Sequence, residues 1–125
     1  MLVFLAAVSA TESAALPDSV RDRAHLFADC AGRFSAVAEH ARMFDGAASE
    51  EAEAQRDIFV ALLNATLPDL DGAEPDSLDW RIQSKAAHAA LLSTAYFSMH
   101  SERARLAREA AARHVAICSA LILPV

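Results

Sequence analysis

The sequence predicts an all-α protein, a single-domain four-helix up-down-up-down bundle with one disulfide that joins the first and last helices. Apolar residues recur at helical spacing in four segments, and short breaks separate these segments. Strong helix formers such as Ala, Leu, Arg and Glu are frequent, whereas there are only three Gly and four Pro. A chain of 125 residues is long enough for one hydrophobic core but not for two.

The first helix is expected to begin near Asp18, directly after Pro17, and to continue to about Phe44. Its apolar residues recur at spacings of three, four or seven, so they share one face of the helix. Asp45 and Gly46 should end it, because glycine adopts the left-handed conformation that a helix terminus often needs. The predicted buried residues are Val20, Phe27, Cys30, Phe34, Val37, Ala41 and Phe44.

The second helix should begin with Ser49 as its N-cap and end at Pro68. Glutamates fill the turn after Ser49, where free backbone amides and the helix dipole favour negative charge. Residues 68–77 should form a loop, because proline, glycine and acidic residues favour turns over a periodic helix. The predicted buried residues of the second helix are Ala52, Gln55, Phe59, Leu62 and Leu63.

Asp76 is expected to cap the third helix, and Asp79 can complete a capping box. A break at residues 98–101 leads to the fourth helix, which Pro124 ends. Short connections make consecutive helices antiparallel neighbours, and the first and fourth helices should also lie side by side. The predicted face of the third helix is Leu78, Ile82, Ala86, Ala89, Leu92 and Tyr96, with Trp80 and Leu91 beside it. That of the fourth is Ala104, Ala107, Ala111, Val115, Cys118 and Ile122.

The two cysteines, Cys30 and Cys118, lie on the apolar faces of the first and last helices. Their depths along these helices differ by roughly 10 Å, an offset that staggered helix ends can absorb. Closing the loop between them would stabilise the fold by roughly 4 kcal/mol in the chain-entropy model. The alternative is a pair of reduced, buried thiols that pack as small hydrophobic side chains. Export from the cytosol favours the disulfide.

Residues 1–15 resemble a signal peptide, and residues 16–125 are assigned to the bundle domain. Leu2 to Val8 is a continuous apolar run, followed by small residues that suit a signal peptidase. The alternative is a hydrophobic N-terminal segment that packs on the bundle. The run is too short to span a bilayer, so we expect no transmembrane segment. The signal peptide predicts a periplasmic or secreted protein.

Charge excludes one class of partner. The formal net charge is -6, and between Asp45 and Asp79 ten acidic residues accompany a single base, Arg56. Nucleic acid binding requires a basic surface that neutralises phosphates, so we expect no nucleic acid partner.

No motif indicates catalysis or a cofactor. The chain lacks a nucleophile elbow, a phosphate-binding glycine loop and a His-Glu-x-x-His helix. It also lacks the Cys-x-x-Cys-His motif for covalent haem and the Glu-x-x-His pairs of a di-iron bundle. We therefore predict a protein that is not an enzyme, with no catalytic residues and no cofactor.

A metal site is the alternative interpretation of the histidines and methionines. His40 and Met43 are one helical turn apart, and Met99 adjoins His100, so these four residues are candidate soft ligands for copper or haem-type binding. The acidic residues of the 68–77 loop suit calcium in charge, but their spacing does not match an EF-hand. Acidic turns and helix caps explain the same residues.

The remaining interpretation is a protein-binding or accessory subunit without catalytic activity. Exposed aromatic residues and arginines often anchor a protein partner. The candidate contact residues are Trp80, Phe97, Arg103, Arg105 and Arg108. The alternative is that the aromatic rings cap the ends of the bundle. A second hypothesis for function is a small-ligand or metal carrier that uses the interior of the bundle.

Overall fold

The computed structural model describes residues 16–70, 72 and 74–122, and these residues form four helices. They are α1 (Val20–Ala41), α2 (Gly46–Thr66), α3 (Glu74–Phe97) and α4 (Ser101–Ile122), with a 3-10 turn, η1 (Leu67–Asp69), after α2. No strand occurs in the described residues. The predicted all-α, four-helix fold is therefore confirmed. The signal peptide predicted over residues 1–15, and the end of the last helix at Pro124, lie outside the described residues.

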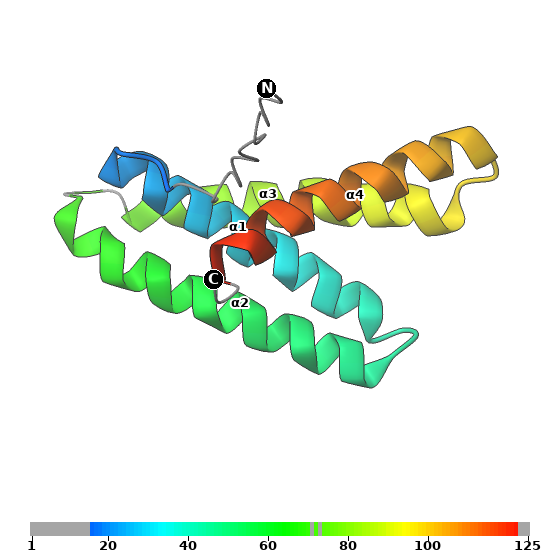
Figure 1. Cartoon of the computed structure of the whole chain (residues 1–125), viewed down its shortest axis with the longest axis horizontal. Coiled ribbons are helices and arrows are strands. Elements are labelled where there is room, and N and C mark those ends of the chain that lie inside the picture. Colours follow the sequence, from blue (N-terminus) through cyan, green and yellow to red (C-terminus); the bar gives the residue numbers. More distant parts are fainter. Residues whose placement is uncertain (1–15, 71, 73, 123–125) are drawn as a thin grey trace, which may run out of the picture.

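Helix α1 lies at the centre of the bundle. Helices α2 and α3 both pack along α1, whereas α4 packs mainly on α3 and meets α1 where its C-terminal half crosses the bundle (Figure 1). Helices α2 and α3 follow one another in the chain but make few contacts with each other. The expectation that all consecutive helices are close neighbours is therefore wrong for this pair, because α1 separates them.

Helix α1 can lie at the centre because two of its sides carry small residues. Gly32 is buried where α3 crosses, and a Cβ atom added there would lie 2.5 Å from the Arg81 carbonyl oxygen and 2.9 Å from the Ser84 Cβ. The Ser84 hydroxyl donates a hydrogen bond to the Asp29 carbonyl oxygen at 2.7 Å. Only glycine permits so close a crossing. Six other small residues of α1 are also buried: Ala24, Ala28, Cys30, Ala31, Ala36 and Ala38.

Aromatic packing joins α1 to α2. The rings of Phe34 and Phe59 are stacked with centroids 5.8 Å apart, and Phe27 lies 6.4 Å from Phe59. Leu63 completes this core with 1% exposure. Such aromatic pairs contribute about 0.5–1.5 kcal/mol beyond the area that they bury. The predicted faces of the first, second and fourth helices are buried or half-buried, except for Phe44, which is 61% exposed.

The predicted disulfide is confirmed. The sulfur atoms of Cys30 and Cys118 are bonded at 2.10 Å, their Cα atoms are 5.6 Å apart, and both residues are fully buried. The bridge ties the last turns of α4 to the middle of α1. Among the described residues, no helix combines the length and apolar character that crossing a bilayer requires.

Several helix ends differ from prediction by about one turn. Asp45, not Ser49, is the N-cap of α2, and it accepts a hydrogen bond from the Ala48 amide at 3.1 Å. Ser49 is buried instead, because its hydroxyl donates to the Ala38 carbonyl oxygen at 2.9 Å. Helix α3 begins at Glu74, so Asp76 lies in its first turn rather than capping it. The predicted loop at 68–77 is correspondingly shorter. Gly46 is the first residue of α2 and has no left-handed conformation.

The predicted buried face of the third helix is wrong except at Leu92, which is half-buried. Leu78, Ile82 and Tyr96 are 55–57% exposed, and the two alanines of that face are also exposed. The crossing at Gly32 turns the opposite, smaller and more polar side of α3 toward α1. The residues on that side are Ser77, Trp80, Ser84, His88, Leu91 and Ala95, all buried or half-buried.

Candidate functional site

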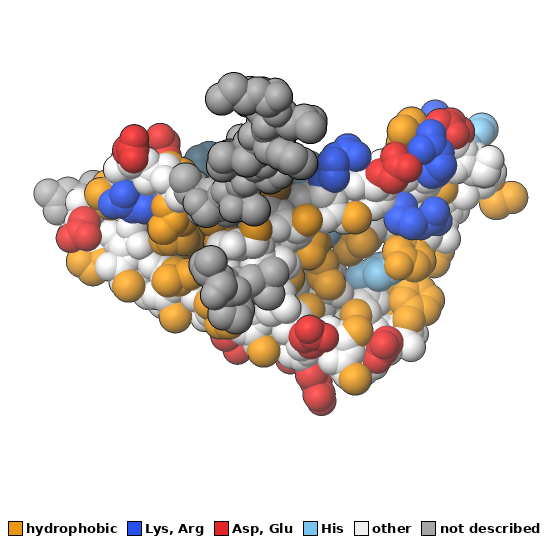
Figure 2. All heavy atoms as spheres, viewed as in Figure 1, with side chains coloured by type: hydrophobic (Ala, Val, Ile, Leu, Met, Phe, Trp, Pro, Cys, Tyr) orange, Lys and Arg blue, Asp and Glu red, His pale blue; other side chains and the backbone are white. Residues whose placement is uncertain are grey.

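An apolar groove of about 410 Å³ lies between α1, α3 and α4. Figure 2 shows the corresponding hollow between α4 and the far end of the α1–α2 pair, with hydrophobic side chains and a histidine inside it. Lysine or arginine side chains border its α4 side, and acidic side chains border the α2 side. The groove stays open because α4 presents alanines that do not fill the space. Its lining residues are Val37, His88, Leu92, Ala95, Tyr96, Arg108, Ala111, Ala112, Val115 and Ala116.

His88 is the unusual polar residue of this groove. It is 1% exposed, and neither ring nitrogen has a hydrogen-bond partner within the described part of the chain. Burial, followed by the nearby positive charges of His114 and Arg33, lowers the pKa of His88 to about 4. The imidazole is therefore neutral at neutral pH, with one donor and one acceptor to offer. Leaving such groups unpaired costs about 1–3 kcal/mol.

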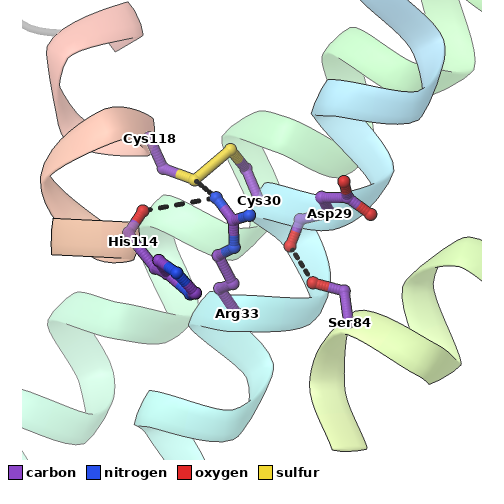
Figure 3. Close-up of a disulfide and its surroundings, with 6 residues drawn as sticks. All are labelled: Asp29, Cys30, Arg33, Ser84, His114 and Cys118. Atoms are coloured by element: carbon purple, nitrogen blue, oxygen red, sulfur yellow. Dashed lines mark hydrogen bonds between the residues drawn. A yellow bond between two sulfur atoms is a disulfide. The ribbon is translucent and has the colours of Figure 1, made fainter. Parts of the chain in front are cut away.

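A second, polar pocket of about 250 Å³ lies on the other side of His88. Its Arg33 guanidinium donates to the His114 carbonyl oxygen at 3.3 Å and to the Cys118 sulfur at 3.4 Å (Figure 3). Burial raises the pKa of the Asp29 carboxyl above its ordinary value, against the opposing charges of His25 and Arg33. These polar contacts and the disulfide fasten α4 to α1. The pocket is lined by Asp29, Arg33, Gln83, Ser84, Ala87, His88 and His114.

An aromatic cluster lies beside the end of the groove that Tyr96 and Arg108 line. The His40 ring lies 4.4 Å from Tyr96, 5.1 Å from Phe44 and 6.4 Å from Phe97, measured between centroids. The other three rings are all more than half exposed. The cluster joins the C-terminal ends of α1 and α3, and its Tyr96 also lines the groove.

The candidate metal ligands fall on two separate segments. His40 and Met43 are at the end of α1, while Met99, which is 97% exposed, and His100 lie in the turn between α3 and α4. The contacts of His40 are aromatic rings, as described above. Over residues 16–70, 72 and 74–122, no three His, Cys, Asp or Glu side chains come together as a metal-binding group.

The candidate protein-contact residues lie at opposite ends of α3. Trp80 is half-buried near its start, where it stacks on His25 at 4.4 Å and lies 5.1 Å from the Arg21 guanidinium. Phe97 lies seventeen residues later, roughly 25 Å along the helix axis. Arg103 borders the same shallow pocket as Phe97.

The other two arginines have different surroundings. Arg105 is paired with Glu102 and Glu109 on the exposed side of α4. Arg108 lines the groove, and its guanidinium donates to the Ala95 carbonyl oxygen at 3.2 Å. The structure thus gathers Phe97, Arg103 and Arg108 near one end of the α3–α4 pair and leaves Trp80 at the other.

No family model, curated protein or solved structure matches this chain. Neither the groove nor His88 was predicted from the sequence, where no motif distinguishes His88 from the other histidines. The small residues around Gly32 were the available indication, because they show where another helix can approach α1 closely.

Proposed function

We propose that the chain is a non-catalytic, protein-binding subunit that works outside the cytosol, and that its contact surface is the exposed side of α3. The observation that carries this proposal is the low charge of that side. Between Leu78 and Phe97 the only charged residues are Asp79, Arg81 and Lys85. Arg81 is half-buried, and Lys85, whose side chain is 42% exposed beside Leu78 and Ile82, is paired with Glu39 of α1. The contact surface consists of Leu78, Asp79, Ile82, Gln83, Ala86, Ala87, Ala89, Ala90, Ser93, Tyr96 and Phe97.

This surface has the shape that helix packing requires. Large apolar side chains occupy its two ends, and alanines occupy its middle, where a second helix can approach closely. Leu78, Ile82 and Phe97 are 55–59% exposed although each is strongly apolar. Contiguous apolar surface on a monomer is typical of a protein contact site.

The occupant that fits best is a second copy of the chain, packed antiparallel through α3. A two-fold axis beside Ala87 places Leu78 opposite the partner's Phe97, and Ile82 opposite the partner's Ser93. Alanines then meet alanines in the centre, so the surface is complementary to itself. Closed two-fold dimers of this kind are the commonest oligomers of soluble proteins.

Charge supports the antiparallel arrangement. It brings Glu74, at the start of α3, close to the partner's Arg103, after the end of α3. Within the described residues, neither side chain has an ion-pair partner. A parallel arrangement would instead place like charges together.

The disulfide supports action outside the cytosol. Disulfides persist in oxidising compartments and are rare where cellular thiols keep cysteines reduced. The Cys30–Cys118 bridge links residues 88 positions apart and is fully buried. A periplasmic or secreted location accords with such a structural bridge.

Sedimentation equilibrium of the purified chain tests the proposal. One helix face is smaller than a standard interface of about 800 Å² per partner, so we expect a dimer with a Kd on the order of 10 µM. Ala86→Glu should abolish the dimer, whereas Ala54→Glu, on the exposed side of α2, should leave it intact. The proposal that a second copy occupies this surface would be overturned if the wild-type chain stays monomeric at ten times that Kd. Equal dimerisation of the two variants would overturn it as well.

A further inference from the structure

We propose that the groove between α1, α3 and α4 binds a small amphipathic carboxylate, with its apolar chain between α3 and α4 and its carboxylate on Arg108. This site shares only Tyr96 with the contact surface, and its other lining residues lie outside that surface, so the proposal does not depend on self-association. Its volume of about 410 Å³ falls within the range of about 300–1,000 Å³ that is common for small-molecule sites.

The groove is elongated and has two different ends. Helices α3 and α4 are antiparallel, so His88 and Ala116 border its inner end, while Tyr96 and Arg108 border its outer end (Figure 1). Eight residues of α3 separate the two ends, which corresponds to roughly 12 Å. The side chains between them are aliphatic and include Val37, Leu92 and Val115, along with alanines of α4. An extended alkyl chain matches this shape and chemistry.

The inner end offers no accessible polar group. His88 is 1% exposed, and both of its ring nitrogens are buried without partners within the described residues. A ligand in the groove does not reach these nitrogens, so the apolar end of the ligand belongs at this end.

The outer end supplies a positive charge. The Arg108 guanidinium makes one hydrogen bond, to the Ala95 carbonyl oxygen, and within the described residues no carboxylate lies within salt-bridge distance of it. Arg105, one turn earlier on α4, is in contrast paired with two glutamates. A guanidinium with free donors beside an apolar channel is suited to a ligand carboxylate.

Calorimetric titration tests the carboxylate contact. The ligands are decanoate, its ω-hydroxy derivative and decanol, each used below the concentration at which it self-associates. We expect both carboxylates to bind. Arg108→Gln should raise the Kd of each carboxylate about five- to tenfold and leave the Kd of decanol unchanged. Arg105→Gln is the matched control, because Arg105 does not line the groove, and should change nothing. Failure of decanoate to bind, or equal effects of the two arginine variants, would overturn the proposal.

The direction of the ligand is tested by the preference between the two carboxylates. We expect the ω-hydroxy acid to bind more weakly than decanoate, because its hydroxyl group would be buried at the apolar inner end without a partner. Ala112→Leu provides a second variant, because Ala112 is an exposed lining residue whose enlargement narrows the groove without disturbing the core. It should weaken the binding of both carboxylates. Binding that is insensitive to Ala112→Leu, or tighter binding of the ω-hydroxy acid, would refute the placement of the ligand.

Discussion

Replacing Gly32 by alanine is expected to destabilise the protein, although alanine is the better helix former. The added Cβ would lie 2.5 Å from the Arg81 carbonyl oxygen and 2.9 Å from the Lys85 backbone nitrogen. Backbone atoms cannot rotate away as side chains do, so α3 must move off α1. Overpacking of this kind costs about 1–3 kcal/mol, and the upper end applies here because the obstacle is backbone.

Two further effects largely offset each other. Moving α3 weakens the hydrogen bond from Ser84 to the Asp29 carbonyl oxygen, which contributes about 1 kcal/mol. Alanine in the middle of a helix is favoured over glycine by about 1 kcal/mol. We therefore expect Gly32→Ala to lower the free energy of unfolding by about 2–3 kcal/mol.

Urea denaturation followed by far-UV circular dichroism measures this change. With a typical urea dependence of about 1–3 kcal/mol per molar, the midpoint should fall by about 1 M or more. Gly46→Ala is the matched control, because a Cβ there meets nothing within 4 Å, and its effect should stay within about 0.5 kcal/mol. A Gly32→Ala protein as stable as the wild type, or more stable, would refute the close crossing of α1 and α3.

Three other changes test the remaining parts of the fold. Replacing Cys30 and Cys118 together by serine removes the bridge between residues 88 positions apart and should lower the free energy of unfolding by about 4.5 kcal/mol in the chain-entropy model; an unchanged urea midpoint of the double variant would contradict this. The pKa of His88 is about 4 in the folded protein and lies below its value of 6.5 in the unfolded chain. The free energy of unfolding should therefore be largest above pH 6.5 and fall by up to about 3 kcal/mol toward pH 4. The raised pKa of Asp29 has the opposite effect on stability. The contribution of the histidine is therefore measured as the difference in free energy of unfolding between the wild type and His88→Leu across the pH range. Parallel curves of the two proteins would count against the burial of His88. Ser49→Ala removes a buried hydrogen bond to α1 and should lower the free energy of unfolding by about 1 kcal/mol in the same denaturation assay. If Ser49 were instead an exposed N-cap, Ser49→Asp would be as stable as the wild type, and that result would contradict the buried hydrogen bond.

The sequence was sufficient to predict the helices, three of their buried faces and the disulfide. In α1 and α2 most large apolar residues lie on one side, so hydrophobic periodicity identifies the side that is buried. Phe27, Phe34 and Phe59 illustrate this, because burying any other face of their helices would expose them. In α4 the buried side is marked mainly by alanines at helical spacing, while Leu106 and Ile117 are exposed. The cysteines followed from the same periodicity, since each falls on the buried side of its helix.

Periodicity failed for α3, where close approach outweighed apolar area. The side with Leu78 and Ile82 is the more hydrophobic, but the side with Ser84 can come within contact of Gly32. A hydropathy pattern does not contain the shape of the neighbouring helix. Ser49 was misassigned for a related reason, because its hydroxyl bonds to another helix rather than to the start of its own.

The groove could not be predicted because it arises from where the helices are fastened together. One turn of α1 makes the main connections: the Asp29 carbonyl oxygen accepts from Ser84, Cys30 is bonded to α4, and Arg33 donates to an α4 carbonyl oxygen (Figure 3). Gly32, in the same turn, sets the crossing with α3. Helix α3 follows α1 to the His40–Tyr96 contact, whereas α4 is held to α1 mainly at this level and its other end diverges from α1. The groove begins one turn beyond, at Val37 and His88, so the contacts that close the core also hold the candidate site open.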